Sequence, residues 1–167
     1  LLMPDRFANG DRANDDLPSS RGLLDRTKPR HYHGGDLAGI RDHLHYLRAL
    51  GVTALWTTPW YDNVNHLNQL EKYTADNRRS ADGEPSTDYH GYGAVDFYGV
   101  EERFGDLSQL RELVNAAHAV GLKVIQDQVA NHAGPYHPWV SNSPTRTWFN
   151  GTAANHLENS WQTWTIA

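Results

Sequence analysis

The chain has 167 residues, of which 38% are hydrophobic, and its formal net charge is −5. This length suits one domain or part of a larger protein, and an acidic chain without a run of Lys or Arg is a poor match for nucleic acid or an anionic membrane. The absence of cysteine excludes disulfides and thiolate metal sites, and no apolar run approaches the ~20 residues of a membrane-spanning helix.

The sequence begins with a short apolar run, Leu1–Met3, which is typical of the end of a strand. Residues 5–35 are polar and rich in Gly, Asn, Asp and Pro, which indicates an irregular segment. A helix is predicted next, from 37 to 50, between an N-cap at Asp36 and a C′ glycine at Gly51. Its apolar stripe consists of Leu37, Ile40, Leu44, Leu47 and Leu50.

A second unit of strand and helix follows. The run VTALWTT, residues 52–58, is predicted to be a strand, and the polar connection from 60 to 95 is long enough to carry function or to be disordered. Another helix is predicted from 106 to 119. After Gly121, the run LKVIQDQV, residues 122–129, is predicted to be a strand. The buried face of the second helix is predicted to contain Leu107, Leu110, Leu113, Val114, Ala117 and Val120.

Strands and helices alternate along the chain, which indicates parallel strands with right-handed crossovers. The predicted joins from helix to strand are one residue long, whereas those from strand to helix are long. In a (β/α)₈ barrel the long loops gather at the carboxyl ends of the strands and carry the active site. We therefore predict an α/β fold, with strands 1–3 and helices 1–2 of a TIM barrel. A doubly wound open sheet is the alternative, but NGDRAND lacks the G-x-G-x-x-G spacing of its phosphate turn.

The first polar segment is a candidate cation site. ANGDRANDD places Asn9, Asp11, Asn14 and Asp15 within seven residues, and GGD at 34–36 adds a carbonyl and another carboxylate. Calcium prefers about six to eight oxygen ligands from carboxylates, amides and carbonyls. The alternative is a solvated turn in which Asn and Asp side chains bond their own backbone.

Two further segments combine polar and aromatic side chains. In QDQVANH, the side chains of Asp127, Asn131 and His132 gather at the carboxyl end of a predicted strand, where a parallel barrel holds its substrate. In DYHGYG, Tyr92 offers a flat ring for the C–H face of a sugar and His90 offers a hydrogen bond, which suits a neutral polyhydroxylated ligand. The alternatives are a structural Asp beside a surface His, and an aromatic minicore beneath a loop.

Taken together, these residues resemble the α-amylase family, glycoside hydrolase family 13. The four segments that carry the resemblance are PDRFANGD with ND, GGDLAGI with LGVTALWTTP, YHGYGAVDFYGVEERFG, and GLKVIQDQVANH. The last is similar to the family's first conserved region, with three residues between Asp127 and Asn131. The resemblance covers nearly the whole chain and is specific because all four segments occur in order. MPDRFANGD and HPWVSNSPTRTWFN are most similar to bacterial cyclomaltodextrinases and neopullulanase-like enzymes.

The resemblance implies an activity and a set of site residues. The implied activity is cleavage of α-1,4-glucosidic bonds in cyclodextrins, maltodextrins or related glucans, with retention of configuration. Tyr92 is implied to stack beneath the sugar at the cleavage site, His90 and His132 to bind its hydroxyls, and Asp127 to belong to the same substrate-binding set. The implied cofactor is Ca²⁺. Its implied ligands are Asn9, Asp11, Asn14, Asp15, Asp36 and the carbonyl of Gly34.

The chain is expected to be an excerpt of a longer parent protein, with part of the catalytic barrel in 1–132 and the start of an insertion domain in 133–167. The resemblance places the family's nucleophilic Asp, acid/base Glu and stabilising Asp on later strands, so no catalytic residue is expected here and the isolated chain is expected to be inactive. The alternatives are a cyclodextrin glucanotransferase-type transglycosylase and a non-catalytic α-glucan-binding relative. A homodimer of the full-length enzyme, and a periplasmic or extracellular location, are further expectations.

Overall fold

The computed structural model describes residues 1–150 of the chain. Within them, the α-helices are α1 (Pro4–Phe7), α2 (Leu37–Asp42), α3 (Leu44–Ala49) and α4 (Leu107–Ala119). The strands are β1 (Ala54–Trp56), β2 (Tyr61–Asp62), β3 (Asn68–Tyr73), β4 (Glu84–Ser86), β5 (Asp96–Val100) and β6 (Lys123–Ile125). Short 3₁₀ helices cover Arg12–Asn14, Pro18–Ser20 and Pro138–Val140.

The centre of the fold is a small parallel sheet. β1 pairs with β6 in parallel, with Leu55 opposite Val124, and Leu2 forms a parallel bridge with Thr57. Three segments therefore run in the parallel arrangement that the sequence predicts. The strands are shorter than predicted, with three residues each in β1 and β6. Among the described residues, β6 pairs only with Ala54–Trp56, and Thr57 forms its bridge with Leu2 instead.

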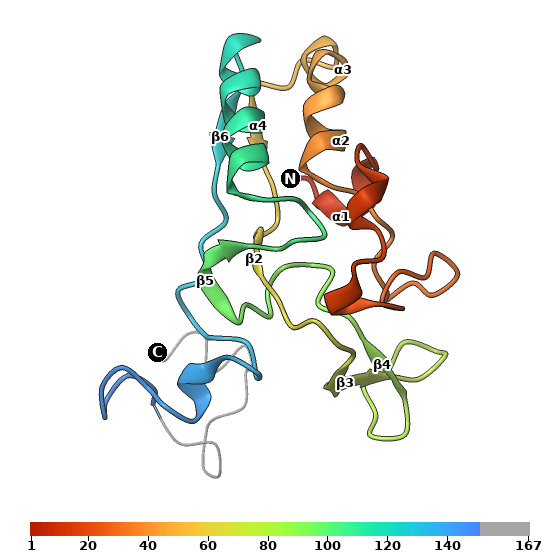
Figure 1. Cartoon of the computed structure of the whole chain (residues 1–167), viewed down its shortest axis with the longest axis vertical. Helices are drawn as coiled ribbons and strands as arrows, with labels where there is room; N and C mark the ends of the chain where they lie inside the picture. The colour runs from red at the N-terminus through yellow and green to blue at the C-terminus, as the bar shows by residue number, and fades with distance from the viewer. Residues whose placement is uncertain (151–167) are drawn as a thin grey trace.

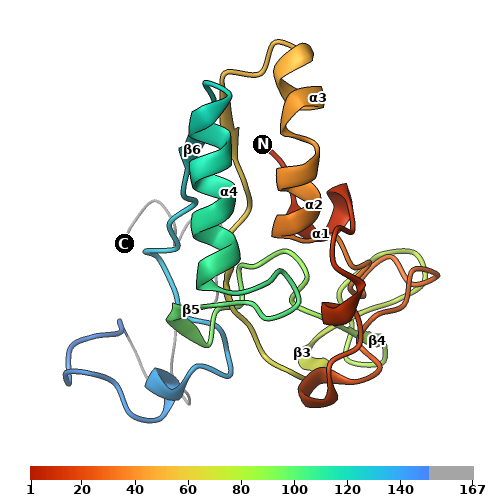
Figure 2. The same cartoon turned by 45° about the horizontal axis from the view of Figure 1, so that its top comes forward.

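The helices cover one face of this sheet (Figures 1 and 2). The apolar stripes of α2, α3 and α4 meet there with Leu55 of β1. The buried residues of the stripes are Leu37, Ile40, Leu44, Leu47, Leu110, Leu113 and Ala117. Two predicted members are wrong, because Leu50 is 63% exposed and Leu107 is 49% exposed. Each lies at a helix end, beyond the reach of the neighbouring helix.

The first predicted helix is divided in two at His43. The backbone N–H of His43 donates to the carbonyl of Ile40 at 3.1 Å, three residues back. Its ring Nδ1 lies 2.8 Å from the carbonyl of Gly39, which a helical N–H would otherwise take. The side chain thus replaces one backbone bond, which separates α2 from α3 without ending the apolar stripe.

Both helical units end in the hydrogen-bond pattern of a Schellman motif. After α3, the N–H of Gly51 donates to Arg48 and the N–H of Val52 donates to Leu47, and Gly121 begins the same pattern after α4. The predicted C′ glycines are therefore confirmed. The joins themselves span four and three residues rather than one, because the cap residues on either side of each glycine belong to neither element.

The connection from 60 to 95, predicted to carry function or to be disordered, contains three strands. β2 pairs antiparallel with β5, and β3 pairs antiparallel with β4 to form a hairpin. Both pairs lie at the end of the molecule opposite the helix-to-strand turns, beyond the carboxyl ends of β1 and β6 (Figure 1). The loop segments that follow each parallel strand are therefore gathered at one end.

Candidate functional site

Two side chains donate hydrogen bonds to Asp127, which lies two residues beyond the end of β6. The hydroxyl of Tyr92 donates to Asp127 Oδ2 at 3.1 Å, and the indole N–H of Trp56 donates to the same oxygen at 2.9 Å. His132 Nε2 lies 3.0 Å from the carbonyl oxygen of Tyr92, so this nitrogen carries a proton. The structure thus brings Tyr92, Asp127 and His132 together at the carboxyl ends of the parallel strands.

His90 completes the predicted substrate-binding group. Its Nδ1 accepts the backbone N–H of Tyr92 at 3.0 Å, and the two rings lie 5.8 Å apart at an angle of 36°. Its Nε2 lies 3.8 Å from Glu71 Oε2. All four predicted residues are therefore neighbours, and Glu71 and Trp56 join them.

The aromatic segment lies close to β1 because of Gly91. This residue has φ +85°, and a Cβ there would lie 2.0 Å from the carbonyl oxygen of Pro59. Pro59 follows β1 at its carboxyl end. Only glycine allows the turn between His90 and Tyr92 to approach the strand so closely.

The electrostatics of the group suit a neutral, hydroxyl-rich ligand. Burial, and then the hydrogen bond to Asp127, raise the pKa of Tyr92, so the phenol stays a donor. Contact with His90 lowers the pKa of Glu71, which therefore remains a carboxylate at neutral pH. Burial raises the pKa of Asp88, although the hydrogen bond from Asn68 opposes this shift.

Asp36 organises the predicted cation loop. Its Oδ1 accepts the N–H of Gly10 at 3.0 Å and of Gly39 at 2.6 Å, and its Oδ2 accepts the N–H of Asp11 at 2.8 Å. It is the N-cap of α2, as predicted, and it is fully buried. The carboxylate of Asp11 accepts the N–H of Ala13 at 2.9 Å. Asp36 therefore ties the loop to the first helix.

The remaining loop residues surround unpartnered oxygens. The amide oxygens of Asn9 and Asn14 are buried without a hydrogen-bond partner. Asn9 Nδ2 donates to Asp15 Oδ1 at 2.7 Å, and a Cβ on Gly34 would lie 2.4 Å from that same oxygen. Buried amide oxygens beside a carboxylate are the donors that a hard cation takes. The amide oxygens of Asn9 and Asn14 therefore fit a hard cation such as calcium, whereas both oxygens of Asp36 already accept backbone N–H groups.

Two other groups of side chains in the described part of the chain could share an ion, and neither was predicted. They are Glu71, Asp88 and His90, and Asp62, Glu101 and Glu102. In the second group, burial followed by the charge of Glu102 raises the pKa of Asp62 to about 6 and that of Glu101 to about 8. Glu101 accepts the N–H groups of Asn63 and Arg103 at 3.1 and 3.3 Å. Its carboxyl group therefore fixes the turn after β5.

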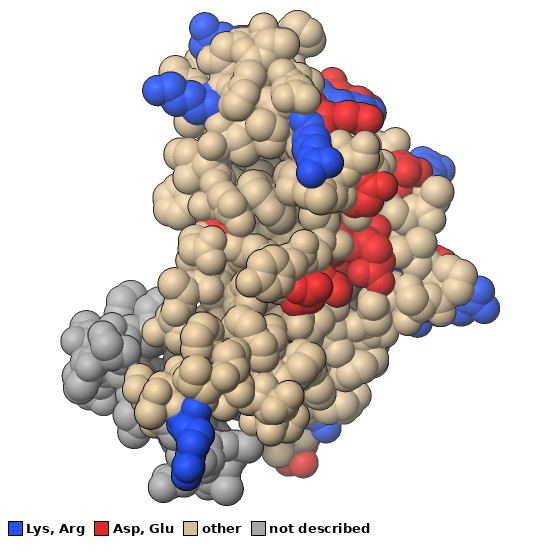
Figure 3. All heavy atoms as spheres, turned by 60° about the vertical axis from the view of Figure 1, so that its left-hand side comes forward, with Lys and Arg blue, Asp and Glu red and all other residues tan. Residues whose placement is uncertain are grey.

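The surface gives no sign of a strongly basic partner site on the face drawn in Figure 3. Lys and Arg side chains are scattered over this face, and acidic side chains gather to the right of its centre. No helix among residues 1–150 is long and apolar enough to cross a membrane.

The sequence matches the α-amylase catalytic-domain family over residues 1–166. The chain belongs to the α-amylase family. It is 38% identical over 135 residues to neopullulanase 2 of Thermoactinomyces vulgaris, an alignment that covers 80% of this chain and 19% of that protein. It is 37% identical over 137 residues to a cyclomaltodextrin glucanotransferase of Paenibacillus macerans, covering 80% of this chain and 17% of that one. This chain of the α-amylase family thus spans about a fifth of the length of these two curated relatives.

Solved structures of the family show the same fold. The cyclomaltodextrin glucanotransferase CldA matches with a TM-score of 0.69 and 41% identity, covering 80% of this chain and 25% of that one. The α-amylase of Geobacillus thermoleovorans, complexed with acarbose, matches with a TM-score of 0.67 and 33% identity, covering 98% and 29%. The predicted fold, the N-terminal part of a (β/α)₈ barrel, is confirmed.

The comparisons confirm the family but not the roles of single residues, which stay predictions. The boundary between 1–132 and 133–167 also stays a prediction, and 151–167 lie outside the described residues. Trp56 and Glu71 were missed as site residues. Trp56 carried a signal, since it is a large aromatic residue near the carboxyl end of a predicted barrel strand. Glu71 carried none, because it lies in a polar run without periodicity.

Proposed function

We propose that this chain forms the substrate-binding side of a retaining α-glucan hydrolase that cleaves α-1,4-glucosidic bonds in cyclodextrins, maltodextrins or related glucans. The observation that carries the proposal is the assembly of His90, Tyr92, Asp127 and His132 at the carboxyl ends of the parallel strands. In (β/α)₈ barrel enzymes the active site lies at this end of the strands, and membership of the α-amylase family supports the same location here.

The geometry suits a platform for one glucose unit. Tyr92 is 37% exposed, and it is held at its hydroxyl by Asp127 and at its backbone by His90 and His132. An apolar C–H face of the sugar can lie on such a ring. Because three contacts fix the ring before substrate arrives, little conformational entropy is lost on binding. The ring of His90 lies 5.8 Å from that of Tyr92, and His132 contacts the Tyr92 backbone, so both imidazoles are neighbours of the proposed sugar position.

The proposed chemistry needs two carboxyl groups on either side of the scissile bond, one as nucleophile and one as acid and then base. In this proposal those groups, and the third carboxylate of the family, belong to later strands of the parent protein. The present chain contributes binding and orientation of the glucan. Residues 133–167 begin the insertion that follows the third barrel strand.

The calcium site is the second part of the proposal. The ligands are Asn9, Asp11, Asn14, Asp15, Asp36 and the Gly34 carbonyl. If bound there, calcium would supply a positive charge that offsets the carboxylates of the loop. Asn9 and Asn14 each contribute an otherwise unpartnered amide oxygen, and Asp36 connects the loop to α2.

A transglycosylase is the second candidate, because curated relatives of this chain include named cyclomaltodextrin glucanotransferases. Transfer and hydrolysis differ in whether a sugar hydroxyl or water accepts the glucosyl unit. We further propose a homodimeric parent protein located in the periplasm or outside the cell. One relative is named as a periplasmic α-amylase of Escherichia coli, which supports that location.

The test is made on the whole parent protein with maltodextrin and a cyclodextrin. We expect cleavage with α-configured first products, seen by NMR, and cyclic products only if transfer dominates. Tyr92→Ala should lower kcat/KM by about tenfold or more, the equivalent of about 1.4 kcal/mol. Tyr98→Ala is the matched control, because that ring is 91% exposed. Glucan binding without cleavage would favour the non-catalytic relative and overturn the hydrolase.

A further inference from the structure

The hairpin of β3 and β4 brings Glu71 to the proposed glucan site. Glu71 Oε2 lies 3.8 Å from His90 Nε2, and the side chains are 31% and 26% exposed. Both therefore face solvent in part, beside the exposed ring of Tyr92. No role for Glu71 follows from the sequence, since it is distant in the chain from every predicted site residue.

The neighbours of His90 fix where its proton lies. Its Nδ1 accepts the N–H of Tyr92, and an accepting nitrogen carries no proton. The neutral ring therefore has its proton on Nε2, the nitrogen nearest Glu71. A separation of 3.8 Å is too long for a direct hydrogen bond. A group between them that accepts one hydrogen bond and donates another would satisfy both side chains.

The hairpin holds Glu71 at this distance. Asn68 Nδ2 donates to Asp88 Oδ1 at 3.0 Å, and both side chains are almost fully buried. Ser86 Oγ donates to the carbonyl of Glu71 at 3.1 Å. The β3–β4 register shifts between Asn68 and Lys72, and such irregularities redirect side chains. The buried contact from Asn68 to Asp88, two residues before His90 in the chain, therefore holds the hairpin strand that carries Glu71 beside His90.

We propose that Glu71 and His90 together bind one hydroxyl of the glucan. In this arrangement His90 Nε2–H donates a hydrogen bond to the hydroxyl oxygen, and the carboxylate of Glu71 accepts a hydrogen bond from the same hydroxyl. Glu71 is then a specificity-determining residue. A hydroxyl is both acceptor and donor, whereas an ether oxygen or a deoxygenated carbon is not. This inference rests on the proposed function, because it requires a glucan at Tyr92.

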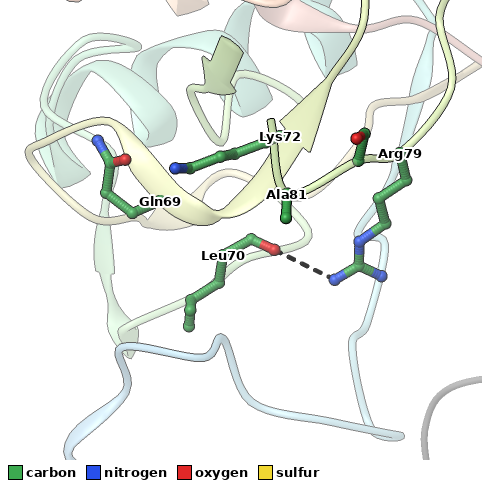
Figure 4. A pocket seen from close by; sticks show the side chains of 6 residues that line it. Gln69, Leu70, Lys72, Arg79 and Ala81 are labelled. Carbon is green, nitrogen blue, oxygen red and sulfur yellow. Dashed lines mark hydrogen bonds between the residues drawn. The ribbon is translucent and has the colours of Figure 1, made fainter. Parts of the chain in front are cut away.

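The hairpin has another concave surface, which fits a sugar less well. A hollow of about 400 Å³ lies beside β3, where Arg79 Nη2 donates to the carbonyl of Leu70 at 3.2 Å (Figure 4). Its lining includes the cationic side chains of Lys72 and Arg79 and no aromatic ring. The sugar is therefore placed at Tyr92, where a ring and neutral donors are available.

The experiment is a cycle of enzyme and substrate changes in the parent protein. kcat/KM is measured for a maltooligosaccharide and for a set of analogues that each lack one hydroxyl. Glu71→Ala should lower kcat/KM about tenfold or more, and Glu71→Gln should recover part of the loss because its amide oxygen still accepts. One deoxy analogue should cost the unaltered protein a similar factor and the Glu71→Ala protein almost nothing further.

The matched control is Glu84→Ala, which removes a carboxylate from β4 of the same hairpin. Its side chain is 73% exposed and pairs with Lys28, so kcat/KM should stay within about twofold. Thermal unfolding of each variant checks the fold, and Glu71→Gln keeps the side-chain shape if the alanine variant unfolds.

Two results overturn the inference. Unchanged kcat/KM in Glu71→Ala, with Tyr92→Ala impaired, removes Glu71 from the site but leaves the proposed function standing. The second result is that Glu71→Ala lowers kcat/KM by the same factor for the natural substrate and for every deoxy analogue. That result would show that Glu71 only orients His90 and contacts no hydroxyl. If the unaltered parent protein neither binds nor cleaves an α-glucan, the proposed function fails and this inference fails with it.

Discussion

Tyr92 and Asp127 are joined by a hydrogen bond of 3.1 Å from the phenol to the carboxylate, although 35 residues separate them in the chain. Asp127 also accepts a hydrogen bond from the indole N–H of Trp56, so its carboxylate still has a partner when the Tyr92 hydroxyl is removed. Tyr92→Phe keeps the ring but loses this hydrogen bond, so it should lower kcat/KM on α-glucans less than Tyr92→Ala does, by about threefold, while the free energy of unfolding falls by less than about 1 kcal/mol. Activity assays and thermal unfolding measure the two effects. Equal loss in both would assign Tyr92 to the core.

Gly91→Ala should strongly destabilise the protein. A Cβ at this position would lie 2.0 Å from the Pro59 carbonyl oxygen, and φ is +85°. Gly51→Ala is the control, since Gly51 has the same φ but nothing within 4 Å of its Cβ position. We expect a loss of about 1 kcal/mol for Gly51→Ala and of several kcal/mol for Gly91→Ala, by denaturant unfolding. Similar losses would show that the close approach to β1 is not needed.

Removal of calcium should lower the midpoint of thermal unfolding. A ligand that binds only the folded state stabilises it by about 2.7 kcal/mol when its concentration is a hundred times Kd. Treatment with a chelator should therefore lower the midpoint, and added calcium should restore it. In Asn9→Ala and Asn14→Ala the response should be weakened, because each loses an unpartnered amide oxygen.

Asp42→Asn serves as the control for calcium, because Asp42 lies on the exposed side of α2, paired with Arg41. Its response to chelator should equal that of the unaltered protein. If the midpoint of thermal unfolding is the same with and without chelator, the loop binds no structural calcium and is a solvated turn.

Glu101 should make stability fall as the pH rises. Burial raises its pKa to about 8 from an ordinary value of 4.5. The folded state then binds more protons than the unfolded state between these values, so the free energy of unfolding decreases from about pH 4.5 to about pH 8. In Glu101→Gln this part of the decrease should disappear. Glu112→Gln, on the exposed side of α4, should keep it, and identical pH profiles for all three proteins would exclude Glu101 as the cause.

The sequence predicted those parts of the fold that depend on local patterns. The stripe from Leu37 to Leu47 and the glycines at the helix ends carry such patterns, and both are confirmed. The division at His43 escaped prediction because it depends on a side chain that takes a helical carbonyl. The β3–β4 hairpin escaped because its residues are polar and contain Pro85. The contacts of Glu71 depend on that hairpin, so no local pattern indicated them.

The most direct test of the central claim is a crystal structure of the parent protein with a bound maltooligosaccharide. The account predicts one glucose unit in van der Waals contact with the ring of Tyr92, with hydroxyls at His90 and His132. A well-ordered sugar bound only elsewhere, such as the hollow beside Lys72 and Arg79, would contradict it.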